Sequence, residues 1–317
     1  MRRIGPSLLI LIMVAGSAIA QTSYPMLMTL QPIAIQVGTT SEMVVKSRYS
    51  MWGANKVMVS GHGVTGVVIH PDPPEPKDGE EVKEPSLTSL TIKFTATPDA
   101  QPGVRDFKMF TDRGVSTVGQ IVITRDEVVW DDTKTDTMEG AKEFQVPATL
   151  TGTFEKNEDL DYFKFSAESG QKLVIHCRCM RLQDRIHDLQ THADPIITIK
   201  NHLGSTIAAC DNYFAADPYL VVDIPQTGEY YLEVRDVRYK SNAYWNYAIE
   251  VIDRPFPTNA FPLAIAADQP AEFELIGDSL EPGTKASFDP FPLALNQGRQ
   301  WLSLPAPDGS LYDPIPV

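Results

Sequence analysis

Clustered positive charge and long apolar segments are both scarce in this chain of 317 residues, which holds 27 Lys and Arg against 41 Asp and Glu. The formal net charge of −14 at pH 7 disfavours nucleic-acid binding, because phosphate recognition requires clustered basic side chains. It equally disfavours docking on anionic membranes. After residue 20, no apolar run approaches the roughly 20 residues that a spanning helix needs. The sequence therefore predicts no nucleic-acid partner and no transmembrane segment once the first residues are removed.

The common catalytic motifs are absent from the sequence as well. There is no Gly-x-Ser-x-Gly elbow to expose a serine at a strained turn, and no His-Glu-x-x-His helix to hold zinc. His176 adjoins Cys177, but neighbouring side chains on a strand point to opposite faces and form no nucleophile–base pair. We therefore expect a protein that is not an enzyme.

Cysteine is rare and its count is odd, since only Cys177, Cys179 and Cys210 occur. Cys177 and Cys179 are two apart on a predicted strand, which places their Cα atoms at the far end of the range for a disulfide. Two interpretations stay open. The cysteines are buried free thiols, or Cys210 forms a disulfide with Cys177 or with Cys179.

The first 20 residues have the three parts of a secretory signal peptide. Arg2 and Arg3 supply positive charge, residues 8–14 (LLILIMV) form a short apolar core, and Ala18-Ile19-Ala20 is a small-x-small cleavage site. We predict cleavage between Ala20 and Gln21 and export to the periplasm, the cell surface or the extracellular space.

Short β-like runs separated by turn residues fill the rest of the chain. The 25 Pro and 20 Gly fall mainly between these runs, and no long amphipathic helix is evident. Many short strands bounded by turns are typical of sandwiches and barrels. We predict an all-β fold with an immunoglobulin-like sandwich, then a jelly-roll-like β-sandwich, then a partial third β unit.

Residues 21–126 are predicted to form the immunoglobulin-like sandwich. Two segments of this unit are similar to segments of bacterial immunoglobulin-like domains in exported proteins. They are Gly53-Ala54-Asn55-Lys56-Val57 and Asp99-Ala100-Gln101-Pro102-Gly103-Val104-Arg105. Within this unit, residues 72–85 (DPPEPKDGEEVKEP) are too polar to pack a core and are interpreted as a solvated acidic, proline-rich loop. The polar, acidic residues 127–142 are interpreted as a linker.

Residues 143–253 carry the most informative pattern. Asp161-Tyr162-Phe163-Lys164-Phe165 alternates as a half-buried strand does, and so does Tyr230-Tyr231-Leu232-Glu233-Val234 after Gln226-Thr227-Gly228. These segments, in this order, closely resemble the bacterial pre-peptidase C-terminal domain. The resemblance implies a jelly-roll-like sandwich that acts as a non-catalytic accessory module, can bind protein or polysaccharide, and in some relatives binds calcium.

The tail, residues 254–317, is rich in proline and has two interpretations. Residues 261–265 (FPLAI) and 271–277 (AEFELIG) resemble the opening strands of another immunoglobulin-like unit, which the remaining residues do not complete. The alternative is a proline-rich extension that packs on its neighbour. We also expect that the chain could be the front part of a longer protein.

Acidic side chains at turns of the second unit suggest calcium, which takes several oxygen ligands from flexible loops. The candidates are Asp159, Asp161, Asp211, Asn212 and Asp217. The competing interpretation is that these side chains cap nearby backbone amides in turns.

Aromatic residues near basic ones suggest a second candidate site. Tyr239, Tyr244 and Trp245 follow Arg235 closely, and an exposed aromatic–cationic strip would suit a sugar or a peptide. The alternative is that these rings belong to the core and its loops.

The leading hypothesis is an exported, non-enzymatic β-protein that binds a protein or polysaccharide of the envelope or extracellular space. One alternative is the accessory portion of a secreted peptidase whose catalytic domain is absent from this chain. The other alternative is an architectural spacer with no ligand.

Overall fold

The computed structural model describes residues 24–71, 85–131, 135–266, 268–289, 301–307, 309 and 311–317. Strands dominate this part of the chain, and its helices are the short η1 (Met138–Gly140) and α1 (Met180–Gln183). The all-β prediction is confirmed. The signal peptide with its Ala20–Gln21 cleavage point, and all but Pro85 of the 72–85 loop, lie outside the described residues. Among the described residues, no helix has the length and apolar character to cross a membrane.

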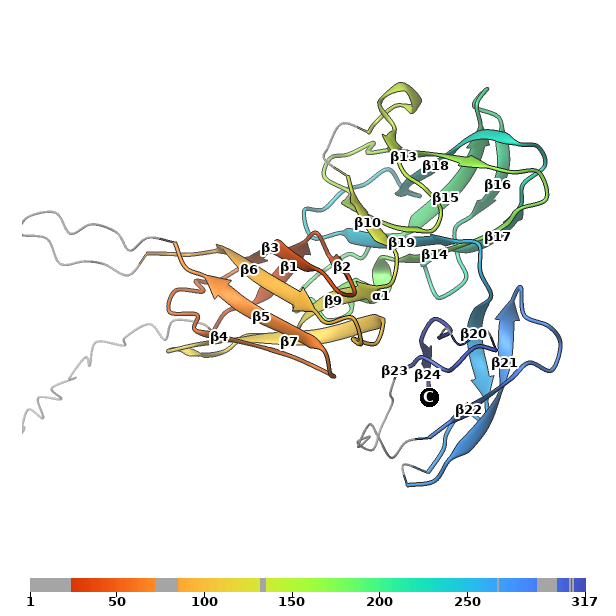
Figure 1. Cartoon of the computed structure of the whole chain (residues 1–317). Helices are drawn as coiled ribbons and strands as arrows, with labels where there is room; N and C mark the ends of the chain where they lie inside the picture. Colours follow the sequence, from red (N-terminus) through yellow and green to blue (C-terminus); the bar gives the residue numbers. More distant parts are fainter. Residues whose placement is uncertain are drawn as a thin grey trace, which may run out of the picture.

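The N-terminal unit is a sandwich of two sheets, drawn in red to yellow in Figure 1. One sheet has the order β1-β3-β6-β5, and the other has the order β2-β9-β7-β4 with β8 paired to β7. The immunoglobulin-like assignment of this unit stays a prediction, and the two sheet orders are compatible with it. The strands are β1 (Leu27–Gln31), β2 (Ala34–Gln36), β3 (Thr40–Ser47), β4 (Lys56–Val59), β5 (Val64–Ile69), β6 (Ser89–Ala96), β7 (Gly103–Thr111), β8 (Gly114–Val115) and β9 (Gly119–Thr124).

Alternation explains how these strands form a core. On β6, Leu90, Ile92 and Phe94 are buried while the residues between them face outward. Phe94 meets Phe107 of the facing sheet edge-on, with ring centroids 5.4 Å apart. The period of two thus places one apolar face of each sheet in a shared interior.

The second unit is a sandwich of two five-stranded sheets, with orders β10-β12-β19-β14-β17 and β11-β13-β18-β15-β16. Its core includes Phe163 and Phe165 of β13 and the fully buried Trp245 and Tyr247. The strands are β10 (Glu127–Trp130), β11 (Lys142–Glu143), β12 (Ala148–Thr153), β13 (Asp161–Ala167), β14 (Lys172–Arg178), β15 (Pro195–Asn201), β16 (Thr206–Cys210), β17 (Tyr219–Asp223), β18 (Gly228–Asp236) and β19 (Asn246–Ile252).

Residues 127–142, which we expected to be a linker, contribute to this second sandwich. β10 pairs in parallel with β12, and β11 pairs in parallel with β13. The linker interpretation is therefore wrong for the described part of this segment. The polar residues between and around these strands hide them, since β10 is a short apolar strand whose Val129 joins the core and β11 has only two residues.

The C-terminal residues form a third, smaller β unit, drawn in blue in Figure 1. The strands β20 (Phe256–Phe261), β21 (Ala271–Asp278) and β22 (Lys285–Phe288) form one sheet. β23 (Trp301–Leu302) and β24 (Ile315–Pro316) pair separately. Phe273, Leu275 and Leu304 are among the buried residues of a small core between them.

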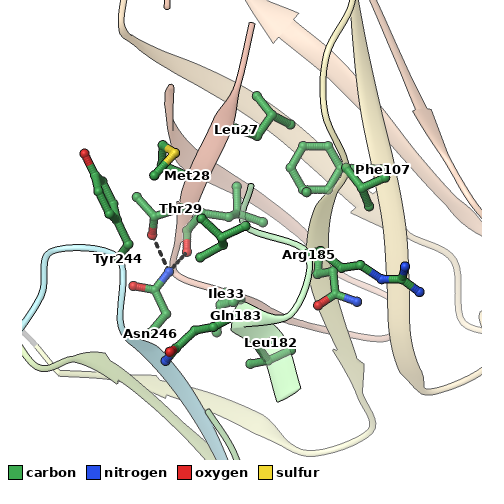
Figure 2. Close-up of a pocket in the computed structure, with 15 residues that line it drawn as sticks. Leu27, Met28, Thr29, Ile33, Phe107, Leu182, Gln183, Arg185, Tyr244 and Asn246 are labelled. Atoms are coloured by element: carbon green, nitrogen blue, oxygen red, sulfur yellow. Dashed lines mark hydrogen bonds between the residues drawn. The ribbon is translucent and has the colours of Figure 1, made fainter. Parts of the chain in front are cut away.

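The N-terminal and second units meet through an apolar contact and a crevice. Ala34 and Val122 of the first unit pack against Leu182 and Ala248 of the second. Figure 2 shows the crevice beside this contact, where the Asn246 side chain donates a hydrogen bond of 2.9 Å to the Leu30 carbonyl. Its volume of about 30 Å³ leaves room for a water molecule and no larger ligand. We therefore treat the crevice as a gap in the junction.

Candidate metal centre

Three carboxylates converge where the second sandwich begins. Asp136 lies between β10 and η1, Asp159 ends the turn before β13, and Asp161 is the first residue of β13. One carboxylate oxygen of each lies within 4.8 Å of the others, although Asp136 is exposed and the other two are buried. This acidic cluster combines two residues that the sequence singled out with one that it did not.

Local hydrogen bonds hold the two buried carboxylates in place. Asp159 accepts the backbone N–H of Glu155 at 2.7 Å. Asp161 accepts the Tyr247 hydroxyl, also at 2.7 Å. The Tyr247 hydroxyl reaches Asp161 across Gly152, where a Cβ atom would lie 2.2 Å from the phenol oxygen. A glycine is therefore needed on β12 for this contact.

The electrostatics of the acidic cluster disfavour its full ionisation. Burial raises the pKa of Asp161 well above its ordinary value, and the nearby charges of Asp131 and Asp159 raise it further. Burial also raises the pKa of Asp159, despite the hydrogen bond from Glu155. A cation bound between these carboxylates would remove that repulsion, which is the arrangement that oxygen-rich calcium sites use.

Lys156 partly neutralises the acidic cluster. Its ammonium group donates a hydrogen bond to Asp136 and lies 3.9 Å from an Asp159 oxygen. The hydrogen bond to Asp136 raises the pKa of Lys156, so the side chain is charged at neutral pH. The lysine side chain is more than half exposed, with an exposed fraction of 56%, so it can move aside for a metal ion.

The other predicted calcium ligands lie elsewhere. Asp211 and Asn212 are exposed in the loop after β16. Asp217 is fully buried and accepts the backbone N–H groups of Cys179, Met180 and Arg181 at 2.6 to 3.2 Å, together with the Arg181 side chain. Of the five candidates, Asp159 and Asp161 belong to the acidic cluster, and the other three do not. Asp217 instead caps the first turn of α1, the role that the competing interpretation assigned.

Asp136 is the ligand candidate that the sequence missed. Asp136 belongs to the acidic segment 127–142, for which the sequence predicts a linker rather than a site. Because β10 and β11 pair with β12 and β13, this segment folds back over the start of β13. This pairing, together with the hydrogen bond of 2.9 Å from the Tyr162 N–H to the Thr135 carbonyl, brings Asp136 beside Asp159. The spacing of these residues in the sequence does not indicate it.

The predicted aromatic strip is divided between the core and the surface. The Trp245 side chain is buried, with 1% exposed, and donates a hydrogen bond of 2.9 Å to the Thr191 carbonyl. Tyr244 lines the crevice of Figure 2. Tyr239 alone of the three is well exposed. The three rings therefore form no continuous exposed strip, because Trp245, the residue before β19, is buried in the core as the alternative interpretation has it.

Tyr239 joins a different group of side chains, on the outer face of the sheet that contains β13, β18 and β15. The Arg235 guanidinium lies over the Tyr239 ring at 4.3 Å from its centroid, and Arg235 is 3.8 Å from Glu233. Glu233 accepts hydrogen bonds from the Tyr162 hydroxyl and from Lys200. We call these five residues the outer-face cluster, in which Tyr239 is exposed, Arg235 and Lys200 are partly exposed, and Glu233 and Tyr162 are buried.

All three cysteines are free thiols in the structure. Cys177 and Cys179 are buried in the core of the second sandwich, and burial raises the pKa of both thiols well above the ordinary value. Cys210 is partly buried at the edge of the same core. The pairing of Cys210 with either of the others is not formed here, which agrees with the free-thiol interpretation.

Comparison with known proteins places the second sandwich in a family. Residues 159–236 match the family model described as the bacterial pre-peptidase C-terminal domain. These residues contain most of the outer-face cluster and two members of the acidic cluster. No curated protein sequence matches the chain.

Solved structures that resemble the chain are distant. A pre-peptidase C-terminal domain of a collagenase from Bacillus anthracis is 13% identical, with a TM-score of 0.28, over 35% of this chain and 93% of that one. PliG, a periplasmic inhibitor of g-type lysozyme from Aeromonas hydrophila, is 15% identical, with a TM-score of 0.24, over 39% of this chain and 96% of PliG. The Bacteroides ovatus protein SGBP-B of a mixed-linkage glucan utilization locus is 8% identical, with a TM-score of 0.20, over 64% of this chain and 72% of SGBP-B. Structural similarity this low indicates nothing about function. The family assignment depends instead on residues 159–236: the chain contains a bacterial pre-peptidase C-terminal domain within its second sandwich.

Proposed function

We propose that the protein is an exported, non-enzymatic accessory module that binds a polysaccharide or protein through the outer-face cluster. We propose further that calcium bound at the acidic cluster fastens the start of β13 to the segment that precedes it. The observation that carries the binding role is the exposed Tyr239 ring beneath Arg235, at the end of a continuous network of polar side chains.

The chemistry of the outer-face cluster suits a hydroxyl-rich or peptide ligand. An exposed tyrosine offers a flat apolar surface for a sugar ring or a side chain, with a hydroxyl at its edge. Arg235 and Lys200 are partly exposed and can donate to ligand oxygens. Glu233 is buried beneath them and accepts hydrogen bonds from Lys200 and Tyr162, so the Lys200 ammonium group is positioned before a ligand arrives.

Other features support an accessory role without catalysis. Thiols with raised pKa values are poor nucleophiles, which argues against cysteine chemistry at Cys177 and Cys179. The predicted signal peptide supports export, and the family of the second sandwich is named for its place beside peptidases rather than for a reaction.

The test is binding by the mature chain beginning at Gln21. The chain is immobilised and presented with envelope polysaccharides and with proteins secreted by the source cells, with and without calcium. Retention that Tyr239→Ala weakens at least about tenfold supports the proposal, since this is the loss expected of a binding anchor. Tyr49→Ala is the matched control, because Tyr49 is also an exposed tyrosine but lies on the N-terminal unit. No retention of the wild-type chain, or equal loss in both variants, contradicts the proposal.

A further inference from the structure

The outer edge of β5 in the N-terminal unit differs from every other sheet edge among the described residues. β5 runs Val64-Thr65-Gly66-Val67-Val68-Ile69 and contains no charged residue, no proline and no register shift against β6. Natural proteins protect exposed edges with such features, because an unprotected edge pairs with other strands. β5 therefore presents an edge that is open to strand pairing.

The remaining edges of the described sheets are protected. Charged, proline or irregular positions interrupt most of them, and the others are two or three residues long. The protecting features are Lys56 in β4, Glu127 in β10, Lys142 and Glu143 in β11, Asp223 in β17, Lys285 in β22, Pro257 and a register shift in β20, register shifts at β1 and β16, and the short lengths of β2, β8, β23 and β24.

The edge of β5 lies far from the second sandwich but close to β4. β5 and β1 are at opposite ends of the same sheet, and β1 contacts β19 of the second sandwich (Figure 1). β4 of the facing sheet lies near β5, yet among the described residues it pairs with β7 and not with β5. Val67 and Ile69 point outward beside the edge, and the exposed fraction of Val67 is 63%.

The register of β5 shows which backbone groups are free. Thr97 N–H donates to the Gly63 carbonyl at 2.8 Å. Every second residue after Gly63, namely Thr65, Val67 and Ile69, is therefore also in a hydrogen-bonded pair with β6. Hydrogen-bonded and non-bonded pairs alternate in an antiparallel ladder. The N–H and C=O groups of Val64, Gly66 and Val68 therefore point away from β6 along the open edge.

We propose that β5 pairs antiparallel with β5 of a second copy of this chain, about a two-fold axis at Gly66. Gly66 then faces its own counterpart, Val64 faces Val68, and every free N–H and C=O group on the edge is paired. On the outer face, Thr65 meets Val67 of the second copy, and β-branched pairs of this kind stabilise sheets. The edge is self-complementary because it is uncharged, so no like charges meet at the axis.

The pairing is tested by sedimentation of the mature chain at concentrations from about 1 to about 200 µM, a range suited to a small interface. We expect a dimer with a dissociation constant on the order of 10 to 100 µM. Val67→Lys and Thr65→Lys each place a charge at the axis and should weaken dimerisation at least about tenfold. Met58→Lys is the matched control, since Met58 is an exposed apolar residue on β4 rather than β5. Circular dichroism and thermal melting check that each variant is folded.

Hydrogen exchange gives a second measurement with residue-level resolution. As concentration rises, the amides of Val64, Gly66 and Val68 should become protected, whereas those of Thr65 and Val67 are already bonded to β6 and should change little. The proposal is overturned if the wild-type chain stays monomeric across the range. It is also overturned if the β5 variants dimerise as well as Met58→Lys does, because the dimer then uses another surface.

Discussion

Arg254 donates a hydrogen bond of 2.9 Å to each carboxylate oxygen of Asp126, a residue 128 positions earlier in the chain. The same guanidinium bonds both carboxylate oxygens of Asp313, at 3.1 and 3.2 Å. Asp126 follows the last strand of the N-terminal sandwich, Arg254 lies between β19 and β20, and Asp313 precedes β24. One side chain therefore ties together the three β units at a single point.

Replacing Arg254 by alanine should destabilise the protein by about 3 kcal/mol, because Asp126 and Asp313 would remain buried without their partner. Chemical denaturation followed by tryptophan fluorescence measures the change. Lys285→Ala is the control, since it removes an exposed ion pair with Glu272 and should leave the free energy of unfolding almost unchanged. Equal effects of the two substitutions would contradict the role of Arg254.

Calcium should raise the melting temperature of the wild-type chain, because an ion bound only to the folded state stabilises it. At a free concentration of about 100 times the dissociation constant the gain is about 2.7 kcal/mol. Asp161→Asn should abolish this gain and, in the presence of a chelator, should melt higher than the wild type, since it removes a repelled buried charge. Asp211→Asn leaves the acidic cluster intact and should respond to calcium as the wild type does.

The stability advantage of Asp161→Asn in chelator should depend on pH. The pKa of Asp161 is raised in the folded state, so the folded chain binds more protons than the unfolded chain just above the ordinary value of 3.8. Stability from this group is present below that value and is lost as pH rises through the raised pKa. Thermal melts should therefore show a larger advantage for the variant at pH 8 than at pH 4. An advantage that is constant with pH would mean that Asp161 is not the titrating group.

The sequence predicted the strands well where alternation is strong and poorly where pairing decides the outcome. The alternating segments 161–165 and 230–234 fall within β13 and β18, because each of these strands has one side on the core. β10 and β11 lie in the segment predicted to be a linker, and they are strands because they pair with β12 and β13. They are only four and two residues long, which gives alternation little room to show.

The candidate sites show the same limit. Asp159 and Asp161 could be identified because they flank the start of an evident strand. Asp136 could not, because its position depends on long-range parallel pairing. For Trp245 the sequence left two interpretations open, an exposed strip or a ring of the core. The structure has Trp245 buried just before β19, two residues from the buried Tyr247.

Thiol labelling should distinguish the three cysteines in the native protein. Cys177 and Cys179 are buried and their raised pKa values keep the reactive thiolate scarce, so an alkylating reagent should reach only Cys210. All three should react after unfolding without a reducing agent, as intact-mass measurement would show. A Cys210 that resists labelling until reductant is added would indicate a disulfide and contradict the free-thiol structure.

Trp245 and Tyr239 should separate stability from binding, although the sequence pattern grouped them. Trp245→Ala removes a ring that is fully packed in the core and should destabilise the chain by about 3 to 5 kcal/mol. Tyr239→Ala removes an exposed ring and should change the free energy of unfolding by no more than about 0.5 kcal/mol. Denaturation of both variants measures this contrast, and Trp245→Phe should recover most of the lost stability because it refills the site. If Tyr239→Ala also destabilises strongly, then the stacking of Tyr239 with Arg235 stabilises the fold. That result would contradict the assignment of Tyr239 as the binding residue of the outer-face cluster.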